Sequence, residues 1–178
     1  MKATEVTRFV TLGDDAKKAL TPEMSADEYI ETLLARQLHP DAVQFIAHYL
    51  PKRQAVWWAL GCVKQAVPPE LPPEQDAAVK TTERWIAEPS EENRQATFKA
   101  AEVADTSTPA GITALAAYYT DALPPTADPE KNAKAYFVTA KLVTAAVMLA
   151  AASDPEKLKV RFSGFASKGA EVVKRTKA

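Results

Sequence analysis

The segment that decides the fold reads Leu50-Pro51-Lys52-Arg53-Gln54-Ala55-Val56-Trp57-Trp58-Ala59-Leu60. A proline such as Pro51 favours the start of a helix, where its fixed φ fits and its missing N–H group is not required. From there to about residue 66 the chain is apolar on nearly every side, which is typical of a helix enclosed by other helices. We therefore expect a central helix over residues 51–66, with Trp57, Trp58 and Trp85 in one buried core.

Helix-start signals recur on both sides of this segment. Ser25 precedes Glu28 by three residues, as in a capping box, and a stripe of apolar residues follows. Prolines end most of the helical patterns, and the 178 residues contain 13 prolines but only 5 glycines. These patterns predict an all-α, single-domain bundle of about seven or eight helices. The expected helices outside the centre cover about 25–38, 40–50, 74–88, 91–104, 109–123, 129–152 and 155 onward.

Two further features concern the organisation of the chain. Residues 1–24 sustain no helical period, so we expect an N-terminal arm with one short helix before a single α-helical domain over 25–178. At an offset of 56, the segment 66–77 is weakly repeated as 122–133, with a double proline between helices in each copy. This repeat leaves a duplicated helix-turn-helix unit open as an alternative to a compact bundle.

The sequence contains no recognisable catalytic or metal-binding pattern. His39 and His48 are the only histidines, and neither belongs to a ligand motif, so we expect no metal and no cofactor. Cys62 lies in an apolar run, where a thiol behaves as a small hydrophobe. The glycine-rich stretch 163–169 has the wrong order for a phosphate loop and is typical of a close-packed helix face. We therefore expect a protein that is not an enzyme and has no catalytic residue.

The most apolar stretch, residues 135–152, approaches the length that spans a bilayer. Lys141 lies inside it, and Thr139 and Thr144 interrupt it, so we expect no transmembrane segment. The first eight residues lack the apolar core of a secretory signal. These observations together predict a cytoplasmic protein.

Charge is unevenly distributed although the chain as a whole carries a net charge of −1. Residues 155–178 hold 7 basic and 2 acidic groups, which leaves 15 basic and 21 acidic groups for residues 1–154. The last helix is then either simply solvated or a basic contact surface. Lys157, Lys159 and Lys168 are its candidate partner-binding residues, because apolar side chains occupy the stripe expected to dock on the bundle.

Lys52 and Arg53 are the other candidate partner-binding residues. Cations in the first turn of a helix oppose the positive end of its dipole, so these two side chains require a compensating group. The structural interpretation is that Lys52 and Arg53 pair inside the fold with Glu83 or Glu102. We expect Arg53, Arg84 or Arg94 to form an ion pair with one of these two acids. The functional alternative is recognition of an acidic partner.

The tryptophan-containing motif also carries a family resemblance. The pattern Leu-Pro-Lys-Arg-x-Ala-Val-Trp-Trp at 50–58, with Glu83-Arg84-Trp85 and the segments 100–102, 109–110 and 145–151, resembles an uncharacterised bacterial all-helical family. The likeness extends from about residue 25 over most of the chain. Members of that family are often encoded near type VI secretion components, so the resemblance implies an accessory, adaptor or chaperone-like role. Gln54 departs from the pattern, in which glutamate is more common, and the resemblance supplies no catalytic residue.

The function expected from these observations is non-enzymatic binding of a protein partner, acidic or belonging to a secretion machine. One alternative is a small-ligand-binding protein or an enzyme with a pocket near Trp57, Trp58 and Trp85, in which Arg53, Glu83, Arg84 and Arg94 supply the polar groups. Another is binding of nucleic acid or an anionic membrane through the basic C-terminal helix. Nucleic acid is the less expected partner, and the sequence does not specify an oligomeric state.

Overall fold

The computed structural model describes residues 1–68, 70–121 and 136–177. The regular structure in these ranges is helical, without a strand and with one isolated bridge between Lys2 and Ser25, so the all-α prediction is confirmed. Eight of the described helices have ten residues or more, in agreement with the expected seven or eight. The elements are α1 (Ala3–Thr7), α2 (Asp14–Ala19), α3 (Ala26–Ala35), α4 (His39–Tyr49), α5 (Lys52–Ala66), α6 (Pro73–Ala87), α7 (Glu91–Ala104), α8 (Pro109–Tyr118), α10 (Val138–Ala152), the 3-10 turn η1 (Pro155–Lys157) and α11 (Leu158–Lys177).

Local capping chemistry sets several of these boundaries. The Ser25 hydroxyl accepts from the Glu28 N–H, and the Glu28 carboxylate accepts in return from the Ser25 N–H at 2.8 Å, which completes the predicted capping box. Ser90 and Thr108 cap α7 and α8 in the same way through their hydroxyl groups. Pro155 differs from expectation, because it opens a 3-10 turn before α11 begins.

Two predictions fall in part on residues outside the described ranges. These are the start of a helix at about residue 129 and the second copy of the weak repeat at 122–133. The described part of that region begins the helix α10 at Val138.

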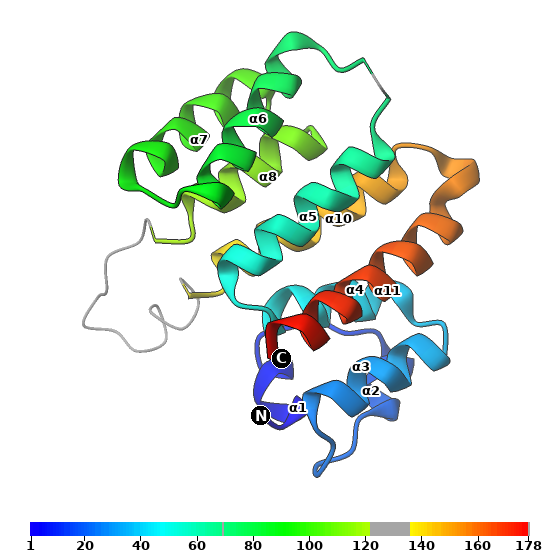
Figure 1. Ribbon diagram of the computed structural model, residues 1–178. Helices are drawn as coiled ribbons and strands as arrows, with labels where there is room; N and C mark the ends of the chain where they lie inside the picture. Colours follow the sequence, from blue (N-terminus) through cyan, green and yellow to red (C-terminus); the bar gives the residue numbers. More distant parts are fainter. Residues whose placement is uncertain (69, 122–135, 178) are drawn as a thin grey trace.

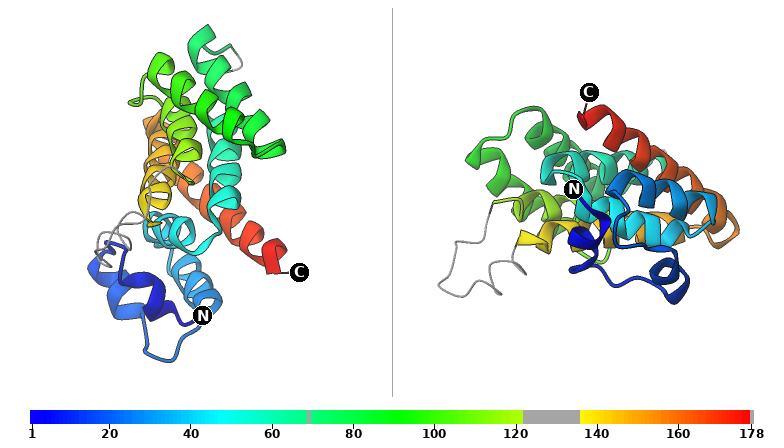
Figure 2. Two further views of the ribbon diagram at one scale, coloured as in Figure 1. Left: turned by 90° about the vertical axis from the view of Figure 1, so that its left-hand side faces the viewer. Right: turned by 90° about the horizontal axis from the view of Figure 1, so that it is seen from below.

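The central elements are α5 and α10, which lie side by side (Figure 1). Helices α6, α7 and α8 pack together at one end of the molecule, and α1 to α3 lie at the other, with α4 and α11 between them (Figure 2). A smaller apolar cluster joins the first group to α5, and its buried members are Leu60, Ala78, Val79, Ala101, Ala104, Ala110 and Ala114. The main core is built largely from α3, α4, α5, α10 and α11.

The first 24 residues contain two short helices rather than the one expected. Two hydrogen bonds attach α2 to the bundle: the Gly13 N–H donates to Asp41 Oδ1 at 2.7 Å, and the Tyr29 hydroxyl donates to the Ala16 carbonyl at 2.7 Å. Next to α1, the Ala26 N–H donates to the Met1 carbonyl at 3.2 Å. The side chains of Val6 and Leu12 are buried in the main core. Apolar burial and these long-range hydrogen bonds thus stabilise the arm although its sequence has no sustained period.

The three tryptophans do not share one environment. Trp58 and Trp85 are buried in the main core as predicted, and the Trp58 indole N–H donates to the Phe165 carbonyl at 3.0 Å. The prediction was wrong for Trp57, whose side chain is 46% exposed. Helix α5 is apolar on nearly every side, but α6 and α11 leave part of its outer face uncovered.

The apolar stretch around α10 forms part of the core, where Val143, Ala146, Val147 and Ala150 are fully buried. Within the described ranges, no single helix has both the length and the hydropathy needed to cross a bilayer. Only α10 taken together with Pro155–Lys177 meets those criteria, and the two segments are bent by 106°.

Candidate functional site

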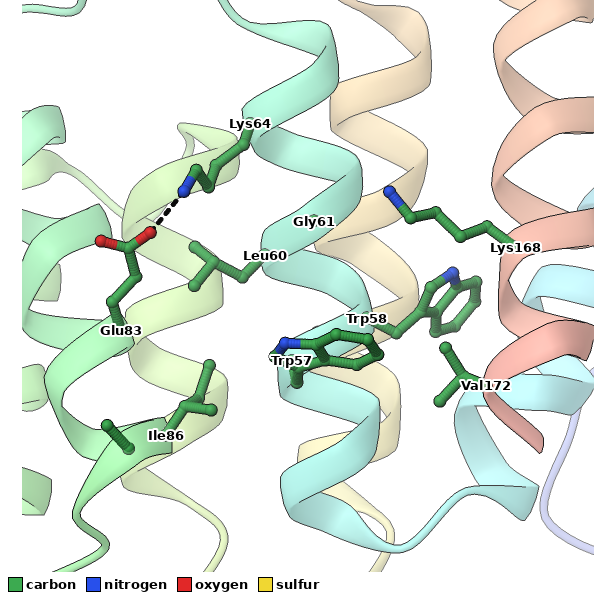
Figure 3. Close-up of a pocket in the computed structure, with 10 residues that line it drawn as sticks. Trp57, Trp58, Leu60, Gly61, Lys64, Glu83, Ile86, Lys168 and Val172 are labelled. Carbon is green, nitrogen blue, oxygen red and sulfur yellow. Dashed lines mark hydrogen bonds and ion pairs between the residues drawn. The ribbon is translucent and has the colours of Figure 1, made fainter. Parts of the chain in front are cut away.

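An open groove of about 520 Å³ lies over the outer face of α5, between α6 and α11 (Figure 3). Helix α5 forms its floor, α6 one wall and α11 the other. We call it the Trp57 groove. It is lined by Trp57, Trp58, Leu60, Gly61, Lys64, Glu83, Ile86, Ala87, Lys168 and Val172.

The helical repeat explains why Trp57 lies in the groove and Trp58 does not face it fully. Adjacent residues of a helix point about 100° apart. Trp58 is directed to α11, where Gly169 allows its ring to approach closely, and its side chain is 1% exposed. Trp57 is directed to the gap between α6 and α11, so almost half of a large apolar ring remains in contact with solvent.

Gly61 lies one turn beyond Trp57 and forms a shallow part of the groove floor. A Cβ atom added at Gly61 would lie 3.7 Å from Lys168 Nζ, an ordinary contact with the end of a flexible side chain. At Gly169 the same atom would lie 2.8 Å from two carbons of the Trp58 ring. Packing within the protein therefore requires glycine at 169 and does not require it at 61.

Charged side chains border the apolar floor on both sides. Lys64 on α5 forms an ion pair with Glu83 on α6 (Figure 3). Lys168 extends from α11 across to Gly61, and no carboxylate of the described residues lies within ion-pair distance of it. The groove thus presents an ammonium group beside an exposed indole ring.

Cys62 is adjacent to the groove in sequence but is fully buried. Burial raises the pKa of its thiol to about 12, and nearby Lys168 only partly opposes this effect. Because the thiolate is the reactive form, this cysteine has none of the properties of a nucleophile at neutral pH.

Lys52 and Arg53 find their compensating groups in backbone carbonyls rather than in acids. Lys52 Nζ donates to the Thr120 carbonyl at 2.9 Å, just after α8, and Arg53 Nε donates to the Ile86 carbonyl at 2.9 Å, near the end of α6. The last carbonyls of a helix carry the negative end of its dipole. Arg53 is thus stabilised by the end of α6, and Lys52 by a carbonyl two residues beyond the end of α8. Burial lowers the pKa of Lys52, and Asp121 opposes this shift.

The predicted ion pairs with Glu83 and Glu102 were therefore wrong in their partners. Arg94 pairs with Glu91 one turn away, at 2.7 Å, and donates to the Tyr118 carbonyl at 2.9 Å. Glu83 pairs with Lys64. In the part of the chain that the structure describes, Arg84 and Glu102 are exposed and take part in no ion pair.

The three lysines of the C-terminal region do not share one face. Lys157 lies in η1 and pairs with Asp154 at 2.9 Å. Lys159 and Lys168 are nine residues apart on α11, which places them about half a turn from each other. Lys159 lines a second groove of about 920 Å³ beside the α3–α4 turn, whereas Lys168 lines the Trp57 groove. A single basic face, on which binding of nucleic acid or membrane would depend, is therefore not formed by these three residues.

The structure also separates the residues of the alternative ligand pocket. Of the residues expected there, Trp57, Trp58 and Glu83 line the Trp57 groove. Trp85 and the three arginines Arg53, Arg84 and Arg94 do not. Neither histidine is part of a ligand cluster: among residues 1–68, 70–121 and 136–177, no three His, Cys, Asp or Glu side chains lie close enough to hold a metal ion. His48 stacks on Phe137, and burial lowers its pKa.

Sequence reasoning missed six of the ten groove residues: Leu60, Gly61, Lys64, Ile86, Ala87 and Val172. Gly61 offered a signal, because a glycine inside an otherwise apolar helix weakens the helix and implies a reason for its presence. Ile86 and Val172 resemble ordinary core residues in their helical patterns, and only the tertiary arrangement brings them to the groove.

A family model described as a family of unknown function, DUF6931, matches residues 29–173. This range contains all ten residues that line the Trp57 groove. No curated protein and no solved structure matches the chain.

Proposed function

The chain belongs to DUF6931, a family of unknown function, and from this premise we propose that it is a non-enzymatic, cytoplasmic accessory or adaptor that binds a segment of a partner protein in the Trp57 groove. The observation that carries the proposal is the position of Trp57. Tryptophan is enriched among the residues that contribute most to protein–protein binding, especially where it lies in an apolar depression. Here Trp57 is 46% exposed, on a floor that includes Leu60 and Gly61 and beside Ile86 of the α6 wall.

Two properties of the groove favour binding over catalysis. Lys64 and Glu83 neutralise each other, so neither is available as a free acid or base without loss of the ion pair. The thiol of Cys62, another residue of α5, is fully buried. What remains accessible is an apolar surface with one ammonium group, which suits recognition better than proton transfer.

The proposal retains Lys168 as a contact residue, since it lines the groove. Lys52, Arg53, Lys157 and Lys159 lie outside this groove, so the contact role predicted for them from the sequence is not part of the proposal. The resemblance noted in the sequence extends the proposal further: the partner would be a component of a bacterial type VI secretion machine, and the protein would assist its assembly or act as its chaperone.

Site-specific photocrosslinking tests this proposal. A photoreactive phenylalanine analogue is placed at position 57, in the groove, and in a matched variant at Val103, which is 68% exposed on α7 and lies outside the groove. In host cells we expect a crosslinked protein band from position 57 that the variant at 103 does not give, and mass spectrometry identifies it. Equal crosslinking from both positions, or none from position 57, would refute the role of the groove. A crosslinked protein unrelated to secretion would refute only the type VI extension.

A further inference from the structure

We infer that the segment bound in the Trp57 groove is a helix that contacts the groove over about two turns and whose side chains include a carboxylate that pairs with Lys168. This inference rests on the proposed function and specifies the chemistry of the partner. It depends on three separate observations: the shape of the groove, the glycine in its floor and the unbalanced charge at its edge.

The shape of the groove fits a helix. Helices α6 and α11 flank α5 on either side, so a helix laid between them would pack on α5 as these two do (Figure 3). Trp57, Gly61 and Lys64 follow one another at spacings of four and three residues, and therefore form one stripe along α5 that lines the groove. At 1.5 Å per residue this stripe is about 10 Å long, which corresponds to about two helical turns.

Gly61 indicates a close approach from outside the chain. Its replacement by alanine would create no clash within the protein, because the nearest atoms belong to the mobile end of Lys168 at 3.7 Å. Alanine would also favour the helix. The distance between packed helices depends on the side chains at their contact, and a glycine allows the shortest distance. The Trp57 ring projects from α5, and Gly61 forms a depression beside it. Packed helices fit together through projections and depressions of this kind.

Charge specifies the partner further. The two cations and one anion of the groove are Lys64, Lys168 and Glu83, and the ion pair between Lys64 and Glu83 leaves Lys168 in excess. An ammonium group next to a partly dehydrated apolar floor is best satisfied by a carboxylate, which forms a charge-assisted hydrogen bond. The partner helix should therefore place Asp or Glu next to the apolar residues that cover Trp57 and Gly61.

The experiment is a selection from a displayed library of amphipathic helical peptides of about four turns, with the full-length protein as bait and Trp57→Ala for counter-selection. We expect the selected peptides to converge on bulky apolar residues spaced three and four apart, with Asp or Glu one turn away. Lys168→Glu should weaken their binding about tenfold or more. Replacing the acidic residue of the peptide by lysine should restore binding to Lys168→Glu and not to the unchanged protein.

Gly61→Ala supplies the steric test, and Gly164→Ala is its matched control. Both glycines lie inside helices without a close neighbour, but only Gly61 lines the Trp57 groove. Gly61→Ala should weaken the selected peptides about tenfold, and Gly164→Ala should leave their affinity unchanged. Selected peptides that lack an acidic residue, fail to become helical by circular dichroism, or bind Gly61→Ala equally well would overturn the inference. So would the absence of any enrichment over Trp57→Ala, or a groove occupied instead by a second copy of the chain. If one of these results were found together with a groove-specific crosslink to a cellular protein, the inference about the helix would fail and the proposed function would hold.

Discussion

Three glycines inside helices give predictions of opposite sign for the same substitution, glycine to alanine. Gly164 in α11 has no atom within 4 Å of an added Cβ, Gly61 in α5 has an ordinary contact at 3.7 Å, and Gly169 in α11 faces the Trp58 ring at 2.8 Å. Alanine stabilises a helix interior by about 0.5–1 kcal/mol relative to glycine. We therefore expect Gly164→Ala and Gly61→Ala to raise the free energy of unfolding by about that amount.

Gly169→Ala should have the opposite effect. The added methyl group must displace Trp58, whose ring is held by the hydrogen bond from its N–H group to the Phe165 carbonyl and contacts Ile46 as well. Inserting a methyl group into a packed core costs about 1–3 kcal/mol. After subtraction of the helical gain, a net loss of up to about 2.5 kcal/mol remains, with a central value of about 1 kcal/mol.

The assay is urea denaturation followed by circular dichroism and by tryptophan fluorescence, with the slope of each transition compared among the variants. Gly169→Ala should unfold at lower urea than the unchanged protein, and Gly164→Ala and Gly61→Ala at higher urea. If Gly169→Ala were as stable as Gly164→Ala, the close packing of α11 on Trp58 would be wrong, and with it the geometry of the Trp57 groove.

Three further predictions concern titration, reactivity and charge. Burial and the nearby charge of Asp41 raise the pKa of Tyr29 from 10.0 to about 12. The folded state therefore favours the protonated phenol. The contribution of Tyr29 to the free energy of unfolding is complete below the unfolded pKa and is lost as pH rises from 10 to 12. Tyr29→Phe should remove that part of the pH dependence of urea unfolding, and an unchanged alkaline profile would contradict the assignment. Burial raises the pKa of Cys62 to about 12. At a pH near the ordinary thiol pKa of about 8.5, Cys62 should therefore not react with an aromatic disulfide reagent until denaturant is added. Rapid labelling of the native protein would contradict this prediction. Lys168→Gln alone should weaken capture of the crosslinked partner. The double variant with Lys157→Gln and Lys159→Gln should not, since these two lysines lie outside the Trp57 groove. The reverse result would place the contact on the other side of α11.

Helix positions were the part of the fold most accessible from sequence. The signals at Ser25 with Glu28, at Ser90 and at Thr108 with Pro109 act within four residues of the chain, so the sequence contains all the interacting groups. The N-terminal arm was less accessible. Its two helices are five and six residues long, and the second is held by hydrogen bonds to Asp41 and Tyr29, which lie far away in the sequence.

The candidate site was predicted only in part, for a reason visible in α5. An apolar helix gives no indication of which side its neighbours leave open, so Trp57 and Trp58 could not be distinguished from the pattern. The compensation of Arg53 by the Ile86 carbonyl was equally hidden, because the end of α6 reaches it only through tertiary packing. In contrast, the sequence alone shows that Lys159 and Lys168 lie on opposite sides of a helix, because they are nine residues apart. The prediction of a single basic face rested on composition and did not take this spacing into account.

The affinity of the purified crosslinked partner for Trp57→Ala tests the central claim most directly. Isothermal titration calorimetry would compare the unchanged protein, Trp57→Ala and the control Val103→Ala, which removes a side chain that is 68% exposed outside the groove. A tryptophan that anchors an interface contributes about 2 kcal/mol or more, so Trp57→Ala should bind about 30-fold more weakly or worse. Val103→Ala should bind normally, and circular dichroism should show all three proteins equally helical. Equal affinity of Trp57→Ala and the unchanged protein would contradict the account.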